Sequence, residues 1–141
     1  MAEAQQAEAR KLPYVAAITD GVRAVMHEQP NAFIAGEDVA GAGGVYGYYN
    51  GLLQEFGPER VYDTPISEEG IVGLGVGAAA TGCRPIIDLM FMDFLGECMD
   101  EVANQLAKMR YMFGGSATLP VTMLTMAGAG MSLAAQHSQS L

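Results

Sequence analysis

Two short polar segments hold the side chains of this sequence that are best suited to acid–base chemistry. One is Ser67-Glu68-Glu69, at the exit of an expected short strand, and the other surrounds His137. A serine followed by two acids is typical of a helix N-terminus, where carboxylates complement the helix dipole. A carboxyl in an apolar pocket can instead hold a raised pKa and donate a hydrogen bond, and histidine titrates near pH ~6.5. Helix capping and proton transfer are therefore the two interpretations of these residues.

Other chemical sites find little support in the sequence. Cys83 and Cys98 are the two cysteines, and no second ligand flanks His137 at metal spacing, so we expect no metal site. A GxSxG motif of serine hydrolases is missing. The GLGVGA run at 73–78 imitates a dinucleotide fingerprint, but it lies inside an expected helix instead of a strand-to-helix turn. We prefer the alternative that Gly73 and Gly77 allow close helix packing, here with another subunit.

The composition describes an acidic chain with a substantial core. Its 141 residues carry 7 Lys and Arg against 16 Asp and Glu, which gives a net charge of −9, and 50% are hydrophobic. One domain of this size can bury a core, whereas the charge argues against nucleic-acid and anionic-membrane binding. The polar N-terminus is unlike a secretory signal, and no apolar stretch reaches the length of a membrane helix. We expect a cytoplasmic protein with reduced thiols.

Helices and strands are expected to alternate. Apolar spacing and turn residues predict helices at 13–28, 52–56, 67–81 and 94–113, and strands at 32–35, 61–62, 85–91 and 121–126. This order predicts an α/β domain with a mostly parallel sheet and helices on both faces, with ligands beyond the carboxyl ends of the strands. We expect residues 1–12 to be a polar lead and 13–141 to be the domain. The end about fifteen residues after the last strand suggests a truncated chain or half of a larger architecture.

Five segments, in order, resemble the β subunit of 2-oxo acid dehydrogenase E1 components, a family that includes pyruvate and acetoin dehydrogenase E1β. The segments are GED at 36–38, DTPISE at 63–68, VGAAATGCRPIIDLMFMDF at 76–94, RYMFGG at 110–115 and AAQHSQS at 134–140. The match covers residues 13–141, and RYMFGG and TMAGAGM look closest to the acetoin branch. Five blocks in order are far more specific than any single block.

The resemblance implies the pyrimidine-binding domain of a thiamine-diphosphate enzyme of the transketolase type. In the family, the diphosphate and Mg²⁺ are held by the α subunit through a GDG…N motif, which this sequence lacks. Family β subunits also have a C-terminal domain that is absent from this sequence. The implied reaction is oxidative decarboxylation of a 2-oxo acid or cleavage of acetoin, with acyl transfer to lipoamide. The implied partners are an E1α-like chain, a second copy of this chain and an E2 lipoyl acyltransferase.

The resemblance also assigns roles to individual residues. Glu68 matches the glutamate that hydrogen-bonds N1′ of the aminopyrimidine and so favours the imino tautomer that removes the thiazolium proton. Phe94 matches the aromatic residue that packs on the pyrimidine, and Met90 a neighbour in the same pocket. His137 matches a histidine near the reacting carbon, and Glu37 an acid lining the channel to the cofactor. A neutral carboxyl at position 68 requires desolvation, so a partner subunit must seal the site.

Three positions depart from the family pattern and leave the substrate open. Leu124 stands where an arginine is usual, Ala127 where the acetoin branch often has an aromatic residue, and Glu69 where an uncharged residue is usual. An alternative hypothesis is therefore a truncated, non-catalytic module that keeps only the fold and the subunit interface. A third hypothesis, an NAD-binding domain, predicts nucleotide binding that does not depend on Glu68.

Overall fold

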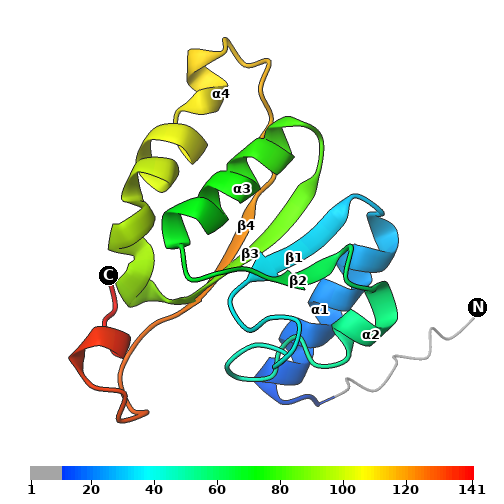
Figure 1. Cartoon of the computed structure of the whole chain (residues 1–141), viewed down its shortest axis with the longest axis vertical. Coiled ribbons are helices and arrows are strands. Elements are labelled where there is room, and N and C mark those ends of the chain that lie inside the picture. The colour runs from blue at the N-terminus through cyan, green and yellow to red at the C-terminus, as the bar shows by residue number, and fades with distance from the viewer. Residues whose placement is uncertain (1–10) are drawn as a thin grey trace, which may run out of the picture.

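The computed structural model describes residues 11–141, and most of the predicted polar lead lies outside the described residues. Helices and strands alternate along the chain (Figure 1). The α-helices are α1 (Tyr14–Glu28), α2 (Leu52–Phe56), α3 (Glu68–Ala80) and α4 (Met109–Met112). The strands are β1 (Ala32–Gly36), β2 (Val61–Asp63), β3 (Arg84–Phe91) and β4 (Thr122–Met126). Two 3₁₀ helices, η1 (Met92–Cys98) and η3 (Ala135–His137), and a π-helix, η2 (Glu101–Leu106), complete the elements.

The four strands form one parallel sheet in the order β2-β1-β3-β4. In the central pairs, Ile34 of β1 lies beside both Val61 of β2 and Ile86 of β3. The chain builds outward from β1 to β2, and then crosses to β3 and β4 on the other side of β1. The strand order therefore reverses between β1 and β3, and such a switch point is where ligands bind in open α/β sheets.

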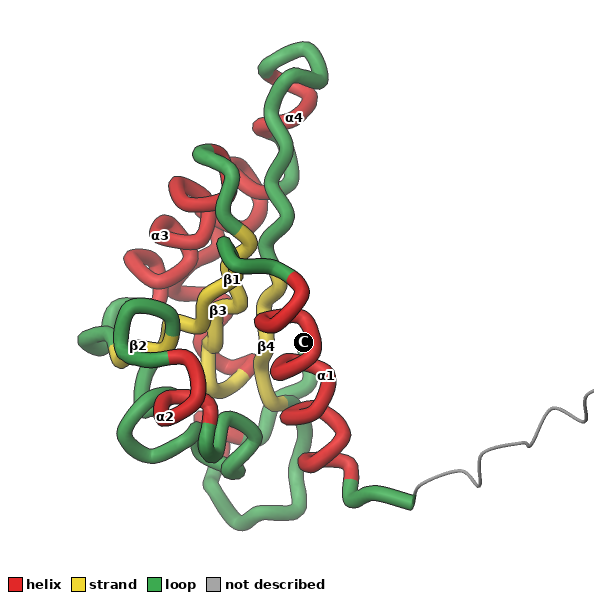
Figure 2. The backbone as a smooth tube through the Cα atoms, turned by 90° about the vertical axis from the view of Figure 1, so that its right-hand side faces the viewer, coloured by secondary structure: helices red, strands yellow, loops and turns green. Residues whose placement is uncertain are grey.

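Helices cover both faces of the sheet, as Figure 2 shows with α1 and α3 on opposite sides of the strands. Neighbouring residues of a strand point to opposite faces. Ile86 accordingly joins the core that includes Met26 of α1, whereas Ile87 joins the core that includes Ile71 of α3. The predicted α/β class, with a parallel sheet and helices on both faces, is confirmed.

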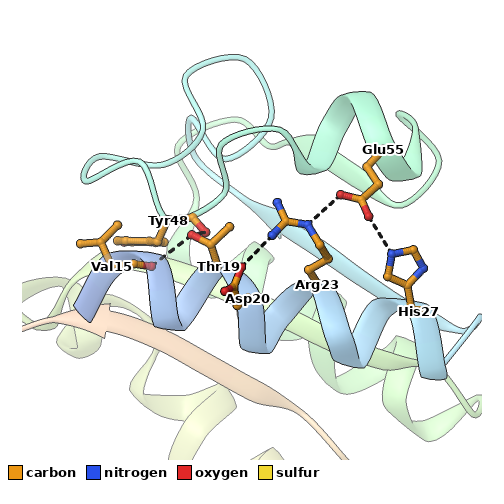
Figure 3. Close-up of polar contacts among 7 residues, drawn as sticks. All are labelled: Val15, Thr19, Asp20, Arg23, His27, Tyr48 and Glu55. Atoms are coloured by element: carbon orange, nitrogen blue, oxygen red, sulfur yellow. Dashed lines mark hydrogen bonds and ion pairs between the residues drawn. The ribbon is translucent and has the colours of Figure 1, made fainter. Parts of the chain in front are cut away.

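Arg23 connects α1 to the segment that precedes β2. Its Nε donates to Glu55 Oε2 of α2 at 2.8 Å, and the other Glu55 oxygen lies 2.7 Å from His27 Nε2 (Figure 3). The Thr19 hydroxyl donates to the Tyr48 carbonyl at 2.8 Å, which ties the glycine- and tyrosine-rich loop to the same helix. The exposed His27 therefore faces a carboxylate.

The glycines of α3 differ in what surrounds them. An added Cβ at Gly75 would lie 3.1 Å from Ile87 Cδ1 and 3.4 Å from Val121 Cγ1, so Gly75 lets the helix pack closely on the sheet. A Cβ at Gly73 would meet only the Glu101 side chain, at 3.7 Å, and one at Gly77 would meet nothing within 4 Å. Close packing inside the chain therefore uses Gly75, and a subunit contact at Gly73 and Gly77 stays a prediction.

The predicted continuous helix over 94–113 was wrong. The chain forms the 3₁₀ segment η1, the π-helix η2 and the short α4 in succession. Val102, Leu106 and Met109 pack against one core as the apolar spacing predicts, but Phe113, which the same spacing places inward, is 59% exposed. In the described part of the chain, no helix has the length and apolar character needed to cross a membrane.

Candidate functional site at the sheet switch point

The carboxyl ends of β1 and β3 lie side by side at the switch point, and this arrangement places two of the predicted site residues, Glu37 and Met90. Gly36 at the end of β1 pairs with Asp88 of β3, so Glu37 emerges beside the last residues of β3. Met90 lies two residues after Asp88 in β3. The topology thus explains why two residues far apart in sequence are at one edge of the sheet.

Glu68 is the first residue of α3, which the chain reaches from β2. Ser67 precedes it but makes no side-chain capping bond to the helix, and its hydroxyl donates to the Pro65 carbonyl at 3.4 Å. The helix dipole favours a carboxylate in this first turn. Glu68 is half-buried and lines an open hollow with Glu97 and Glu101. This chain by itself therefore leaves the Glu68 carboxyl accessible to water.

Glu37 and Glu68 interact electrostatically. Partial burial raises the pKa of the Glu37 carboxyl, and the negative charges of Glu68, Asp38 and Asp88 raise it further. Glu68 is the largest of these three charges in its effect on Glu37. The charge of Glu68 therefore acts on Glu37, and the raised pKa means that the Glu37 carboxyl holds its proton to higher pH than an ordinary glutamate does.

Phe94 and His137 form an aromatic cluster with Phe91. The His137 ring stands edge-on to Phe91 at 4.8 Å and to Phe94 at 5.4 Å between ring centroids. Edge-on contacts of this kind add to the energy of simple burial. A hollow of about 190 Å³ is lined by His137, Phe91 and Tyr46, together with Ala127 and neighbours in the loop after β4. Phe91 and His137 of this cluster therefore line a small cavity.

Backbone bonds hold the C-terminal segment over this edge. The Gln139 N–H donates to the Asp93 carboxylate at 3.2 Å, and the Gly128 N–H donates to the Gln139 carbonyl at 2.8 Å. The first bond joins the segment to η1, and the second joins it to the loop after β4. Two hydrogen bonds of Gln139, two residues after His137, therefore fix this end of the segment.

Met90 occupies a bulge in β3, and the sequence analysis missed the residue that supports it. The pairing of β3 with β4 is irregular between Asp88 and Phe91, and Met90 has a φ of 60°. The Met90 N–H donates to the Asp88 carboxylate at 2.6 Å. Asp88 is 3% exposed. The sequence does contain a signal for Asp88, which is a single acid inside the apolar run PIIDLMF. Carboxylates are rarely buried unless they have a partner, so an acid in a buried strand indicates one.

Among the described residues, no hydrogen bond or ring contact joins Glu68 or Glu37 directly to Phe94 or His137. Glu68 begins α3 and Phe94 lies in η1, and these two elements pack against each other. Leu124, one of the departures from the family pattern, packs against the core of α1 and β1. No three His, Cys, Asp or Glu side chains within residues 11–141 are arranged to hold a metal ion.

A parallel sheet whose strand order reverses between β1 and β3 defines an open α/β domain of the class that binds ligands at the carboxyl edge of the sheet. Residues 10–141 match the family described as "Transketolase, pyrimidine binding domain", and the chain belongs to that family. A solved structure, "Split gene transketolase, inactive beta4 tetramer", has the same fold with a TM-score of 0.60 and 18% identity, over 86% of this chain and 35% of that chain.

Curated relatives support the predicted resemblance to E1 β subunits. The acetoin:2,6-dichlorophenolindophenol oxidoreductase subunit beta of Bacillus subtilis (strain 168) is 50% identical over 94% of this chain. Its counterpart from Cupriavidus necator is 47% identical over 94%, and the pyruvate dehydrogenase E1 component subunit beta of Bacillus subtilis is 41% identical over 93%. The chain spans only 42%, 42% and 40% of the length of these relatives.

Proposed function

We propose that residues 13–141 are the pyrimidine-binding part of a β-type E1 subunit that uses thiamine diphosphate. The observation that carries the proposal is the position of Glu68 at the start of α3, on an open hollow after β2, where its charge raises the pKa of Glu37 at the end of β1. The relatives named acetoin oxidoreductase and pyruvate dehydrogenase subunits support the reaction class. We infer oxidative decarboxylation of a 2-oxo acid or cleavage of acetoin, with acyl transfer to lipoamide.

The residues at this edge have the chemistry that an aminopyrimidine requires. Glu68 supplies a carboxyl for a hydrogen bond to the ring nitrogen N1′, and its negative charge raises the pKa of Glu37. Phe94 supplies an aromatic surface for the ring, and Met90 an adaptable apolar contact. When bound, thiamine diphosphate supplies the nucleophilic carbon and the electron sink that side chains lack. His137, in contact with Phe94, is the candidate for moving protons to and from the substrate.

A partner chain is part of the proposal because the Glu68 hollow is open. A carboxyl remains protonated near neutral pH only when water is largely excluded from it. Half-buried Glu68 lacks that protection within this chain. We propose that an E1α-like chain closes the hollow and holds the diphosphate and Mg²⁺, with a second copy of this chain and an E2 acyltransferase in the same assembly. The proposed location of the assembly is the cytoplasm.

Exposed apolar side chains support an assembly. Ile66, just before Glu68, is 81% exposed, and Tyr111 and Met112 of α4 are 90% and 72% exposed. Tyr111 and Met112 are adjacent, and adjacent exposed apolar side chains are typical of contact surfaces between subunits. Ile66 is also at the rim of the Glu68 hollow, so a chain that covers it would also exclude water from the carboxyl.

The test is reconstitution. The complete β subunit that contains this chain is mixed with a matching α chain, thiamine diphosphate and Mg²⁺, and reduction of an artificial dye is followed with pyruvate and with acetoin. We expect turnover only when both chains are present, and the preferred substrate decides between the two branches. Full activity without the α chain would contradict the proposal. No cofactor uptake by the mixture, measured by calorimetry, would favour a module that keeps only the fold and the interface.

A further inference from the structure

Asp88 is the only carboxylate among the described residues that is fully enclosed by the chain, with 3% exposure. It lies in β3 between Ile87 and Leu89, which are themselves buried. Enclosing an ionisable group costs free energy, so a buried carboxylate is expected to have hydrogen-bond partners inside the protein. Burial raises the pKa of Asp88, whereas the Met90 N–H and the nearby tyrosine hydroxyls lower it.

Asp88 holds the backbone of Met90 in an unfavourable conformation. Met90 has a φ of 60°, in the left-handed region that residues with a side chain rarely adopt. Its N–H donates to the Asp88 carboxylate at 2.6 Å, and so a bond within the strand replaces the ladder bond that the bulge removes. The acid therefore compensates for both costs of the bulge, the strained φ and the unpaired N–H.

The positions of the residues after the bulge depend on the geometry of the bulge. Pairing between β3 and β4 resumes at Phe91, which lies beside Met126. Phe91 then meets His137 at 4.8 Å and Phe94 at 5.9 Å between ring centroids. Because strand side chains alternate between faces, a change of one residue in this register would turn Phe91 away from both rings.

Two other elements support the Asp88 carboxylate. An added Cβ at Gly36 would lie 2.9 Å from Asp88 Cβ and 2.8 Å from its carbonyl oxygen, so β1 leaves just enough room for Asp88. The hydroxyls of Tyr48 and Tyr49 lower the pKa of Asp88 by less than burial raises it, and the buried Tyr49 hydroxyl has no hydrogen-bond partner among the described residues. Asp88 therefore lies between the end of β1 and the bulge of β3.

We propose that Asp88 is a positioning residue, whose carboxylate fixes the Met90 bulge and thereby sets Phe91 against Phe94 and His137 at the cofactor edge. The inference rests on the proposed function for what binds at that edge. The structural part concerns this chain alone. In a general packing role, the effect of replacing Asp88 would not depend on Met90. In the proposed role, it depends on the backbone conformation of Met90.

A double-mutant cycle in the complete β subunit, assembled with its α chain, tests this dependence. Asp88→Ala removes the acceptor, Asp88→Asn keeps a carbonyl oxygen in its place, and Met90→Gly makes the positive φ inexpensive. We expect Asp88→Ala to weaken thiamine diphosphate binding about tenfold and Asp88→Asn less than about threefold. In the Met90→Gly background, Asp88→Ala should add less than about threefold. An equal effect in both backgrounds, or no effect of Asp88→Ala on binding, would overturn the inference.

Amide exchange separates this inference from the proposed function. If the wild-type assembly takes up no thiamine diphosphate, the proposed function fails, and deuterium exchange at the Met90 amide still decides the role of Asp88. We expect fast exchange of the Met90 amide in Asp88→Ala and slow exchange in Asp88→Asn. Equal protection of this amide in the two variants would refute the proposed role of Asp88. If Asp88→Ala folds only when combined with Met90→Gly, the coupling is supported. If neither form folds, Asp88 is a general requirement of the fold and the inference is wrong.

Discussion

The Phe94 ring stands edge-on to the His137 imidazole, with centroids 5.4 Å apart and planes at 87°. Phe94 belongs to η1, directly after β3, and His137 belongs to η3, beyond β4. Because β3 and β4 are parallel neighbours, both segments leave the sheet at its carboxyl edge. The sheet topology therefore brings a histidine from the end of the sequence to the aromatic residue that we assign to the cofactor.

Replacing His137 separates proton transfer from binding. We expect His137→Gln in the reconstituted enzyme to lower turnover by about a hundredfold or more, since a positioned acid–base group contributes on this scale. Cofactor affinity, measured by calorimetry, should change little. The matched control is His27→Gln, which alters the other histidine, paired with Glu55 on the surface. Equal turnover in the two variants would remove His137 from its proposed role.

The two glycines of α3 should respond in opposite directions to alanine. Gly75→Ala places a methyl group 3.1 Å from Ile87 Cδ1, so we expect a loss of about 1–3 kcal/mol in the free energy of unfolding from overpacking. Gly77→Ala meets nothing within 4 Å, and helix propensity should increase stability by about 0.5–1 kcal/mol. Urea unfolding of both variants measures the difference. A stabilising Gly75→Ala would show that the packing of α3 on β3 is looser than described.

Glu37 should make stability depend on pH. Its folded-state pKa is raised above the ordinary value of 4.5, so the folded state binds the proton more tightly than the unfolded state does. The wild type should therefore lose stability relative to Glu37→Gln as pH rises from about 4 through the folded-state pKa towards about 7. Urea unfolding across this range gives the difference. Adding Glu68→Gln to both proteins should reduce it, because Glu68 is the strongest of the charges acting on Glu37. If the wild type instead gained stability relative to Glu37→Gln as the pH rises, the raised pKa of Glu37 would be contradicted.

Local sequence signals determined most of the fold. Pro13 and Pro30 bracket the first helix, and the structure has α1 at Tyr14–Glu28. The segment after β3 was mispredicted because apolar residues every three or four positions fit 3₁₀, α and π-helices alike. Gly96 lies in the middle of that segment and weakens a regular α-helix there.

The candidate site could be predicted only in part. The rule that ligands bind at strand ends, together with the resemblance, selects Glu37, Glu68 and His137 from the sequence alone. The role of Asp88 was not visible, because it depends on the positive φ of Met90 and on the register between β3 and β4. Such tertiary features leave no periodic pattern in a sequence.

The central claim is that the Glu68 carboxyl activates thiamine diphosphate, and exchange of the cofactor's C2 proton tests it most directly. The rate is measured by NMR on the complete β subunit assembled with its α chain, for the wild type, Glu68→Gln and the neighbouring control Glu69→Gln. We expect Glu68→Gln to slow the exchange about a hundredfold or more, on the scale of a lost acid–base group, while Glu69→Gln remains close to the wild type. An unchanged exchange rate in Glu68→Gln, with the cofactor bound, would contradict the account.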